Sequence, residues 1–224
     1  MQGRWGSDHG LGLLTFQLFI INNKKMKYET LSSVVQVPVF SRSDIPPHQG
    51  TLYDYQLTRW VRKGYLLKLK NGVYAFAREA GRIKGEEVAT LLYEPSYLSL
   101  ESALSHYGII PEMVFAYVSV TPKITRTFGN ALGRFVYRHV KSALFWGYSE
   151  VKTETGRFLM AEPEKAVLDY LYLNLAKINS EEDYMNLRFN EDRLRETLDR
   201  EKFHRYLKAF DVKKMERWAQ RCLP

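Results

Sequence analysis

The sequence predicts an α+β fold in which a basic segment of short helices and a β-hairpin precedes a larger mixed α/β domain. Three observations support this. The excess of basic residues lies in residues 1–85, which hold 13 Lys and Arg against 5 Asp and Glu, whereas residues 86–224 hold 20 of each. Asn71-Gly72 separates two strand-like runs, a strong hairpin signal. Beyond residue 86, strand-like runs alternate with apolar helical patterns, which predicts an antiparallel or mixed sheet followed by a helical tail.

Composition excludes several classes of protein. The 224 residues are 45% hydrophobic and 26% charged, which is typical of a globular chain. Cys222 is the single cysteine, so neither an internal disulfide nor a multi-thiolate zinc site is possible, and a reducing, cytoplasmic location is expected. Because no apolar stretch reaches the roughly 18 residues of a membrane span, we expect no membrane association.

Residues 1–25 are interpreted as a leader that precedes the folded protein. The apolar run from Leu11 to Ile21 is too short to span a bilayer, and a signal peptide is disfavoured because Asn22-Asn23-Lys24-Lys25 follows without a small-x-small cleavage site. The expected start of the protein is therefore Met26.

The basic segment reads as helix, short helix, helix and hairpin. Residues 28–37 form the first helix, which Pro38 ends, and Ser41 with Asp44 caps a second that Pro46-Pro47 cuts short. Residues 51–63 form the clearest helix, with an apolar stripe of Tyr53, Leu57, Trp60 and Val61 and with Gly64 as its C-cap. Residues 65–69 and 73–76 are the hairpin strands. This order is that of a winged helix-turn-helix, spanning residues 26–80.

In such a module the third helix enters the major groove and the hairpin lies along the DNA backbone. The face of residues 51–63 opposite the apolar stripe is polar and basic, which suits contacts with base edges and phosphates. The alternative is a solvated face of an ordinary helix. The candidate DNA contacts are Thr51, Tyr55, Gln56, Thr58, Arg59, Arg62 and Lys63 on the helix, and Lys68, Lys70 and Asn71 on the hairpin.

A polar connector, residues 77–85, separates this module from a second domain, residues 86–224. Its expected helices are residues 86–93, 100–107, 164–176 and 192–210, the last broken near Asp199, and a final helix capped by Asp211. Its expected strands are residues 114–121, 134–140, 144–151 and 157–161. The tail after Ala176 matches no motif.

A second basic stretch lies within this domain. Residues 113–149 contain no acidic residue, and Lys123 and Arg126, with Gly129 and Gly133 close behind, predict a flexible basic loop between strands. Lys123 and Arg126 are therefore further candidate DNA contacts, although a solvated loop explains them equally well.

Signals for catalysis are weak. The chain has neither a GxGxxG nor a GxxxxGK[ST] motif, and its five histidines lack metal-ligand spacing. Glu162-Pro163-Glu164-Lys165 holds the acid and lysine that a metal-dependent nuclease needs, but acids and a proline are also typical of a helix start. We therefore expect no catalytic residue, no metal and no cofactor.

Three blocks of sequence resemble the AbiE-type antitoxin and transcriptional-regulator family of type IV toxin–antitoxin systems. They are Leu57 to Leu66 running into Lys70-Asn71-Gly72-Val73-Tyr74, Ser96 to Ile109, and Glu162 to Leu171. The blocks stand in the order of the family. The sequence departs from the family at its N-terminal leader and at the short second helix.

The resemblance implies a bacterial cytoplasmic autorepressor of an abortive-infection, or phage-defence, system. Its winged helix would bind inverted repeats in its own promoter, as a monomer or weak dimer on double-stranded DNA. Its second domain would counteract a separately encoded nucleotidyltransferase-like toxin, with or without direct contact. Two alternatives stay open: a metal-dependent nuclease with a DNA-targeting domain, and an interaction protein that binds the toxin.

Overall fold

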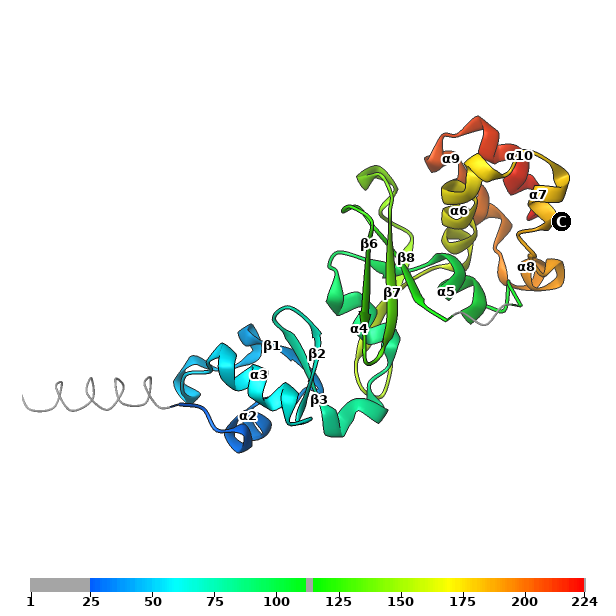
Figure 1. The fold of residues 1–224 in the computed structure, drawn as a ribbon. Coiled ribbons are helices and arrows are strands. Elements are labelled where there is room, and N and C mark those ends of the chain that lie inside the picture. The colour runs from blue at the N-terminus through cyan, green and yellow to red at the C-terminus, as the bar shows by residue number, and fades with distance from the viewer. Residues whose placement is uncertain (1–24, 112–114, 224) are drawn as a thin grey trace, which may run out of the picture. The chain divides into compact units, whose positions relative to one another are not determined.

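The computed structural model describes residues 25–111 and 115–223, so the expected leader, apart from Lys25, and Val114 at the start of an expected strand lie outside the described residues. The described chain is a mixed α+β structure, as predicted. It divides into two compact units, one ending at Gly81 and the other beginning at Arg82 (Figure 1). Each unit is described by itself below.

Unit 1 combines two helices with a small sheet. Its elements are α2 (Tyr28–Val34), β1 (Val39–Ser41), 3-10 turns at Arg42–Asp44 and Pro47–Gln49, α3 (Asp54–Arg62), β2 (Leu66–Lys70), β3 (Val73–Phe76) and a 3-10 segment at Ala77–Arg82. The strands form an antiparallel sheet in the order β1-β3-β2. The predicted short second helix is a single 3-10 turn, Arg42–Asp44, with Ser41 at its start and the Asp44 carboxylate accepting from the Ser41 amide, as expected. It does not extend into an α-helix, because Pro46 and Pro47 lack the amide hydrogens that a longer helix needs.

The core of unit 1 forms where the inner faces of both helices meet the sheet. Leu31 from α2, Leu57 and Trp60 from α3, and Leu66 and Phe76 from the hairpin are all buried in one cluster. Met26 belongs to the same cluster and is 2% exposed. One side of α3 is therefore packed in the core, and the opposite side is exposed to solvent.

Unit 2 is built on a mixed six-stranded sheet in the order β6-β7-β5-β4-β9-β8. The strands are β4 (Tyr97–Leu98), β5 (Tyr117–Thr121), β6 (Arg126–Asn130), β7 (Gly133–His139), β8 (Tyr148–Lys152) and β9 (Arg157–Ala161). The pairs β5–β7 and β4–β9 are parallel, and the other neighbours are antiparallel.

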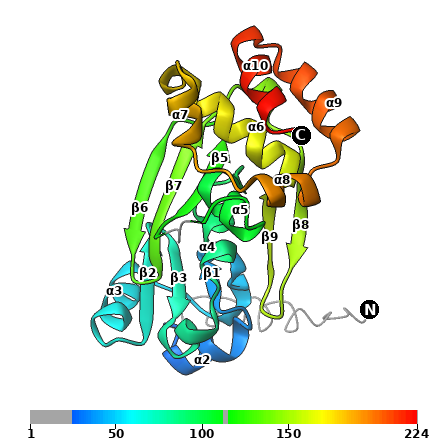
Figure 2. The ribbon, with the colours of Figure 1, turned by 90° about the vertical axis from the view of Figure 1, so that its right-hand side faces the viewer.

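Helices cover both faces of this sheet. On one face, the Tyr137 hydroxyl donates to the Ala89 carbonyl oxygen of α4 (Gly85–Leu92). On the other face, the Tyr97 hydroxyl donates to Asp169 of α6 (Pro163–Asn174), beside which lies α5 (Leu100–His106). The tail continues as α7 (Glu181–Met185), α8 (Glu191–Thr197), α9 (Arg200–Phe210) and α10 (Lys213–Arg221). Figure 2 shows α9 and α10 lying against α6.

Two predictions about unit 2 are wrong. The expected basic loop is confined to residues 122–125, which include Lys123; from Arg126 onward the chain forms the hairpin of β6 and β7, with Arg126 opposite Tyr137, because this segment completes the edge of the sheet. Asp211 does not cap the last helix; it adopts a left-handed conformation (φ 50°) that ends α9, and Val212 precedes α10. The predicted break near Asp199 is confirmed, since the Asp199 carboxylate accepts a hydrogen bond from the Lys202 amide and caps α9.

None of the described helices combines the length and the apolar character needed to cross a bilayer.

Candidate nucleic-acid interface

One side of α3 presents a row of polar and basic side chains to solvent. Tyr55, Thr58, Arg59, Arg62 and Lys63 are all exposed. The helix ends sharply because Gly64 takes a left-handed conformation (φ 71°), in which its amide donates to the Val61 carbonyl oxygen at 3.0 Å. Such a row of donors on a rigid helix suits contacts with phosphates and base edges.

The acidic residue of α3 is neutralised locally. Asp54, the first residue of the helix, forms an ion pair with Arg42 at 2.7 Å. The same guanidinium donates to the Leu52 carbonyl oxygen, which ties the turn before α3 to the helix. The carboxylate therefore does not oppose a polyanion with an unpaired charge.

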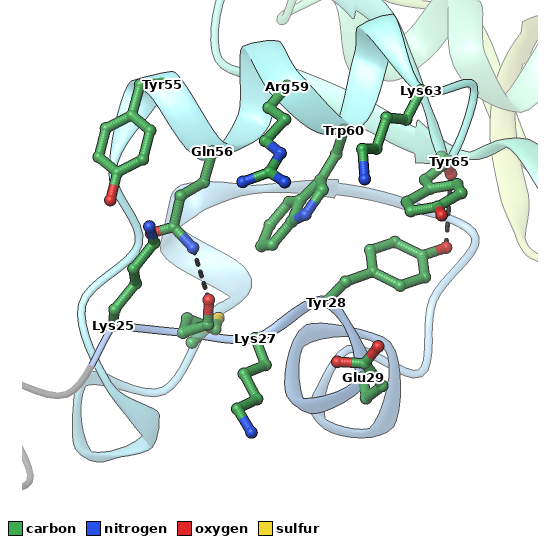
Figure 3. A pocket seen from close by; sticks show the side chains of 11 residues that line it. Lys25, Lys27, Tyr28, Glu29, Tyr55, Gln56, Arg59, Trp60, Lys63 and Tyr65 are labelled. Carbon is green, nitrogen blue, oxygen red and sulfur yellow. Dashed lines mark hydrogen bonds between the residues drawn. The ribbon is translucent and has the colours of Figure 1, made fainter.

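Gln56 does not belong to the exposed row. Its side chain is 3% exposed and its Nε2 donates to the Met26 carbonyl oxygen (Figure 3). Its Oε1 accepts from the Tyr53 amide at 3.2 Å. The prediction that Gln56 contacts DNA is therefore wrong: on the helix it shares the buried side with Leu57 and Trp60.

Thr51 also differs from its predicted place. The helix begins at Asp54, three residues later than expected, and Thr51 lies before it in a parallel bridge with Lys25. The Thr51 carbonyl oxygen accepts from the Met26 amide at 3.0 Å. Thr51 thus connects α3 to the segment before α2 and is not part of the exposed row on the helix.

The hairpin after α3 carries Lys68, Lys70 and Asn71. Lys68 and Asn71 are exposed, and Gly72 closes the turn with φ 81°. The strand register passes from Lys68 opposite Tyr74 to Lys70 opposite Val73. At this bulge the side chain of Leu69 is buried, Lys68 is exposed and Lys70 is half-buried.

Two cations beside α3 were missed from the sequence. The hydrogen bonds of Met26 bring Lys25 and Lys27 alongside the helix, where the Lys25 amino group lies 4.6 Å from the centre of the Tyr55 ring. The signal was present as the basic residues on both sides of Met26, but Lys25 was assigned to the leader and Lys27 was not considered as a contact.

Lys123 and Arg126 belong to unit 2, where they surround one aromatic ring. Their cationic groups lie 5.5 and 5.8 Å from the centre of the Tyr93 ring. The Lys123 amino group also donates to the Glu94 carbonyl oxygen. Both side chains are exposed, so their predicted contact with DNA stays a prediction.

The acid and lysine of the Glu162–Lys165 block are buried at the start of α6, as a structural role predicts. Lys165 is fully buried and pairs with Asp169, whose other oxygen accepts from Tyr97 and Ser99. Burial lowers the pKa of Lys165 and raises that of Asp169, because both lose water. Glu164 accepts from the Asp199 amide at 2.9 Å and pairs with Lys202 at 3.2 Å.

Lys165 is thus occupied by the buried Asp169, and Glu164 is held by the Asp199 amide and the ion pair with Lys202. In the part of the chain that the structure describes, no three His, Cys, Asp or Glu side chains gather as a metal site would require. Among the described residues, the exposed basic row of α3 and the neighbouring hairpin form the surface that we consider best suited to bind an anionic ligand.

No protein-family model matches the chain, and a search of the curated proteins finds no similar sequence.

Proposed function

We propose that the chain is a sequence-specific DNA-binding autorepressor whose unit 1 acts as a winged helix-turn-helix. One observation carries the proposal: α3 is anchored by its buried side and exposes Tyr55, Thr58, Arg59, Arg62 and Lys63 on the other. The hairpin that follows directly exposes Lys68 and Asn71. In this mode α3 enters the major groove of inverted repeats in the chain's own promoter, and the hairpin follows the backbone.

The charge of unit 1 supports the same mode of binding. Residues 26–85 hold 10 Lys and Arg against 4 Asp and Glu, and one of these acids, Asp54, is paired with Arg42. The release of counterions from DNA favours binding to such a basic surface at moderate salt. The guanidinium of Arg59 or Arg62 can also form two hydrogen bonds with the edge of a guanine base.

We further propose that the chain is the cytoplasmic antitoxin of an AbiE-type system and counteracts a nucleotidyltransferase-like toxin. The motivation is the resemblance of the three sequence blocks. Two of them pack together inside unit 2, where the Tyr97 and Ser99 hydroxyls donate to Asp169; the Tyr107 hydroxyl donates at 2.8 Å to the carbonyl oxygen of Ala161, the residue before the third block. These blocks thus support the unit from within, and its outer surface is left for the antitoxin role.

The test of DNA binding is a band-shift titration of the full chain on the DNA upstream of its own gene. We expect that duplex to bind at lower protein concentration than a scrambled duplex of equal length and composition. Equal binding to both would defeat the proposal. The antitoxin role is tested by co-expression with the neighbouring reading frame: rescue of growth supports it, and persistent toxicity contradicts it.

A further inference from the structure

A pocket of about 540 Å³ opens beside α3 in unit 1. It lies between the helix and the segment that leads into α2 (Figure 3). Arg59, Trp60 and Lys63 reach toward it from α3, and Tyr28 faces them from the other side. Its volume falls in the range of small-molecule sites, which is about 300–1,000 Å³.

The two walls of this pocket are held together by specific hydrogen bonds. Gln56 of α3 donates to the Met26 carbonyl oxygen, and the Met26 amide donates to Thr51 at 3.0 Å. At the far end the Tyr28 hydroxyl donates to the Tyr65 carbonyl oxygen at 3.5 Å. Because these bonds join segments on both sides, the pocket is formed before any ligand arrives, which lowers the entropy cost of binding.

Aromatic rings form one part of the lining. The ring of Tyr28 lies 5.6 Å from that of Trp60, edge-on, and 4.9 Å from that of Tyr65. Trp60 is 7% exposed, so its indole belongs to the floor. A flat heteroaromatic ligand can pack against such a group of rings and gain both burial and ring–ring contact.

Cations form the other part. Lys25, Lys27, Arg59 and Lys63 line the pocket against one carboxylate, Glu29. Within residues 25–111 and 115–223, no carboxylate lies within ion-pair distance of any of these four side chains. A site that places unpaired cations beside aromatic rings is complementary to a ligand that is both anionic and aromatic.

We propose that this pocket binds a free nucleoside monophosphate. The base packs against Tyr28, Trp60 and Tyr65, and the phosphate accepts hydrogen bonds from Arg59 and Lys63. Arg59 and Lys63 also belong to the exposed row that is proposed to contact DNA. Nucleotide binding therefore competes with DNA; this consequence rests on the proposed function, whereas the nucleotide site itself does not.

Isothermal titration calorimetry of the full chain with the four ribonucleoside monophosphates tests the site. We expect at least one of them to bind with one site per chain, and adenosine or inorganic phosphate alone to bind at least about tenfold more weakly, since each supplies half of the contacts. Arg59→Gln should weaken binding about tenfold. Arg62→Gln is the matched control: it removes an exposed guanidinium from the same helix outside the pocket, and should leave the affinity within about twofold.

Equal weakening by the two arginine variants would overturn the site, because general attraction to a basic surface would then explain binding. Absence of binding by all four nucleotides would also overturn it, as would tighter binding of a 5′-phosphorylated single-stranded decamer than of any mononucleotide. Thermal unfolding of each variant verifies that it is folded.

A chain that binds nucleotide but fails the band-shift test contradicts the proposed function and leaves the site intact. Operator binding that persists at saturating nucleotide overturns the competition.

Discussion

Gln56 and Met26 are joined by a hydrogen bond that fastens α3 to the segment preceding α2. The side-chain Nε2 of Gln56 donates to the Met26 carbonyl oxygen, and the side-chain Oε1 accepts from the backbone amide of Tyr53. One buried polar side chain thus sets both the start of α3 and the distance between the helix and its neighbour. The exposed row on α3 depends on this arrangement, because a helix that could rotate would not present the same residues to DNA.

Gln56→Leu should destabilise the protein by about 1–3 kcal/mol, since it leaves the Met26 carbonyl and the Tyr53 amide without their partner. Urea unfolding measures the change. The same substitution at the exposed Gln36, in unit 1, is the control and should stay within about 0.5 kcal/mol. Equal effects of the two substitutions would show that the buried hydrogen bonds contribute nothing to stability.

Lys68→Ala should reduce the slope of log affinity against log salt by roughly 0.9, because the exposed amino group on β2 is expected to neutralise one phosphate. The preference for the operator over scrambled DNA should not change. Fluorescence anisotropy at several salt concentrations gives the slope, and Lys208→Ala, which removes an exposed lysine of α9 in unit 2, is the comparison. A slope that Lys68→Ala leaves unaltered would remove Lys68 from the interface.

Lys165→Met should cost about 3–5 kcal/mol of stability, because it leaves Asp169 buried without its cation. The double variant Lys165→Met with Asp169→Leu removes both charges and should recover much of that loss, although Tyr97 and Ser99 lose their acceptor. Chemical unfolding of the single and double variants measures the difference. A double variant as unstable as the single one would contradict the importance of the unpaired charge.

The stability of unit 2 should depend on pH through Glu162. Burial alone would raise the pKa of Glu162, but the hydrogen bonds from Tyr206 and Lys202 outweigh it and lower the pKa below its ordinary value of 4.5. A carboxyl with a lowered pKa stabilises the folded state above its ordinary pKa, and this contribution is lost as the pH falls through the folded value.

Tyr206→Phe keeps the ring against Trp146 and removes one of these hydrogen bonds. Wild type should therefore be more stable than the variant at pH 7, and the gap should narrow as the pH falls below 4.5. Melting temperatures across this range provide the measurement, and Tyr172→Phe on α6 is the control. A gap that is constant with pH would exclude Glu162 as the partner responsible.

Local signals in the sequence predicted the elements that local chemistry determines. The Asn71-Gly72 turn predicted the hairpin, and the apolar spacing of Leu57 and Trp60 predicted α3. The strands β1 and β4 were missed because they have only three and two residues and exist through pairing with distant strands. The edge strand β6 was taken for a loop because its glycine and polar residues resemble a turn when its partner β7 is not considered.

The residues of the candidate site were predicted correctly only where local helical spacing determines their exposure. Exposed Arg59 and Arg62 follow from helical spacing alone. Gln56 was misassigned because its polar side chain was expected in solvent, although helical spacing places it beside Trp60, four residues on. Lys165 and Asp169, four residues apart, could equally have formed a surface ion pair. Only the packing of α6 on the sheet buries them.

The most direct test of DNA recognition by α3 is the affinity of the full chain for its upstream duplex, compared between wild type and Arg59→Ala. Fluorescence anisotropy against operator and scrambled DNA should give a loss of about 1–3 kcal/mol on the operator and a smaller loss on scrambled DNA, because a base contact is removed. Arg205→Ala, an exposed arginine of α9, should leave both affinities within about twofold. Equal affinity of wild type and Arg59→Ala for the operator would contradict recognition through Arg59 on α3.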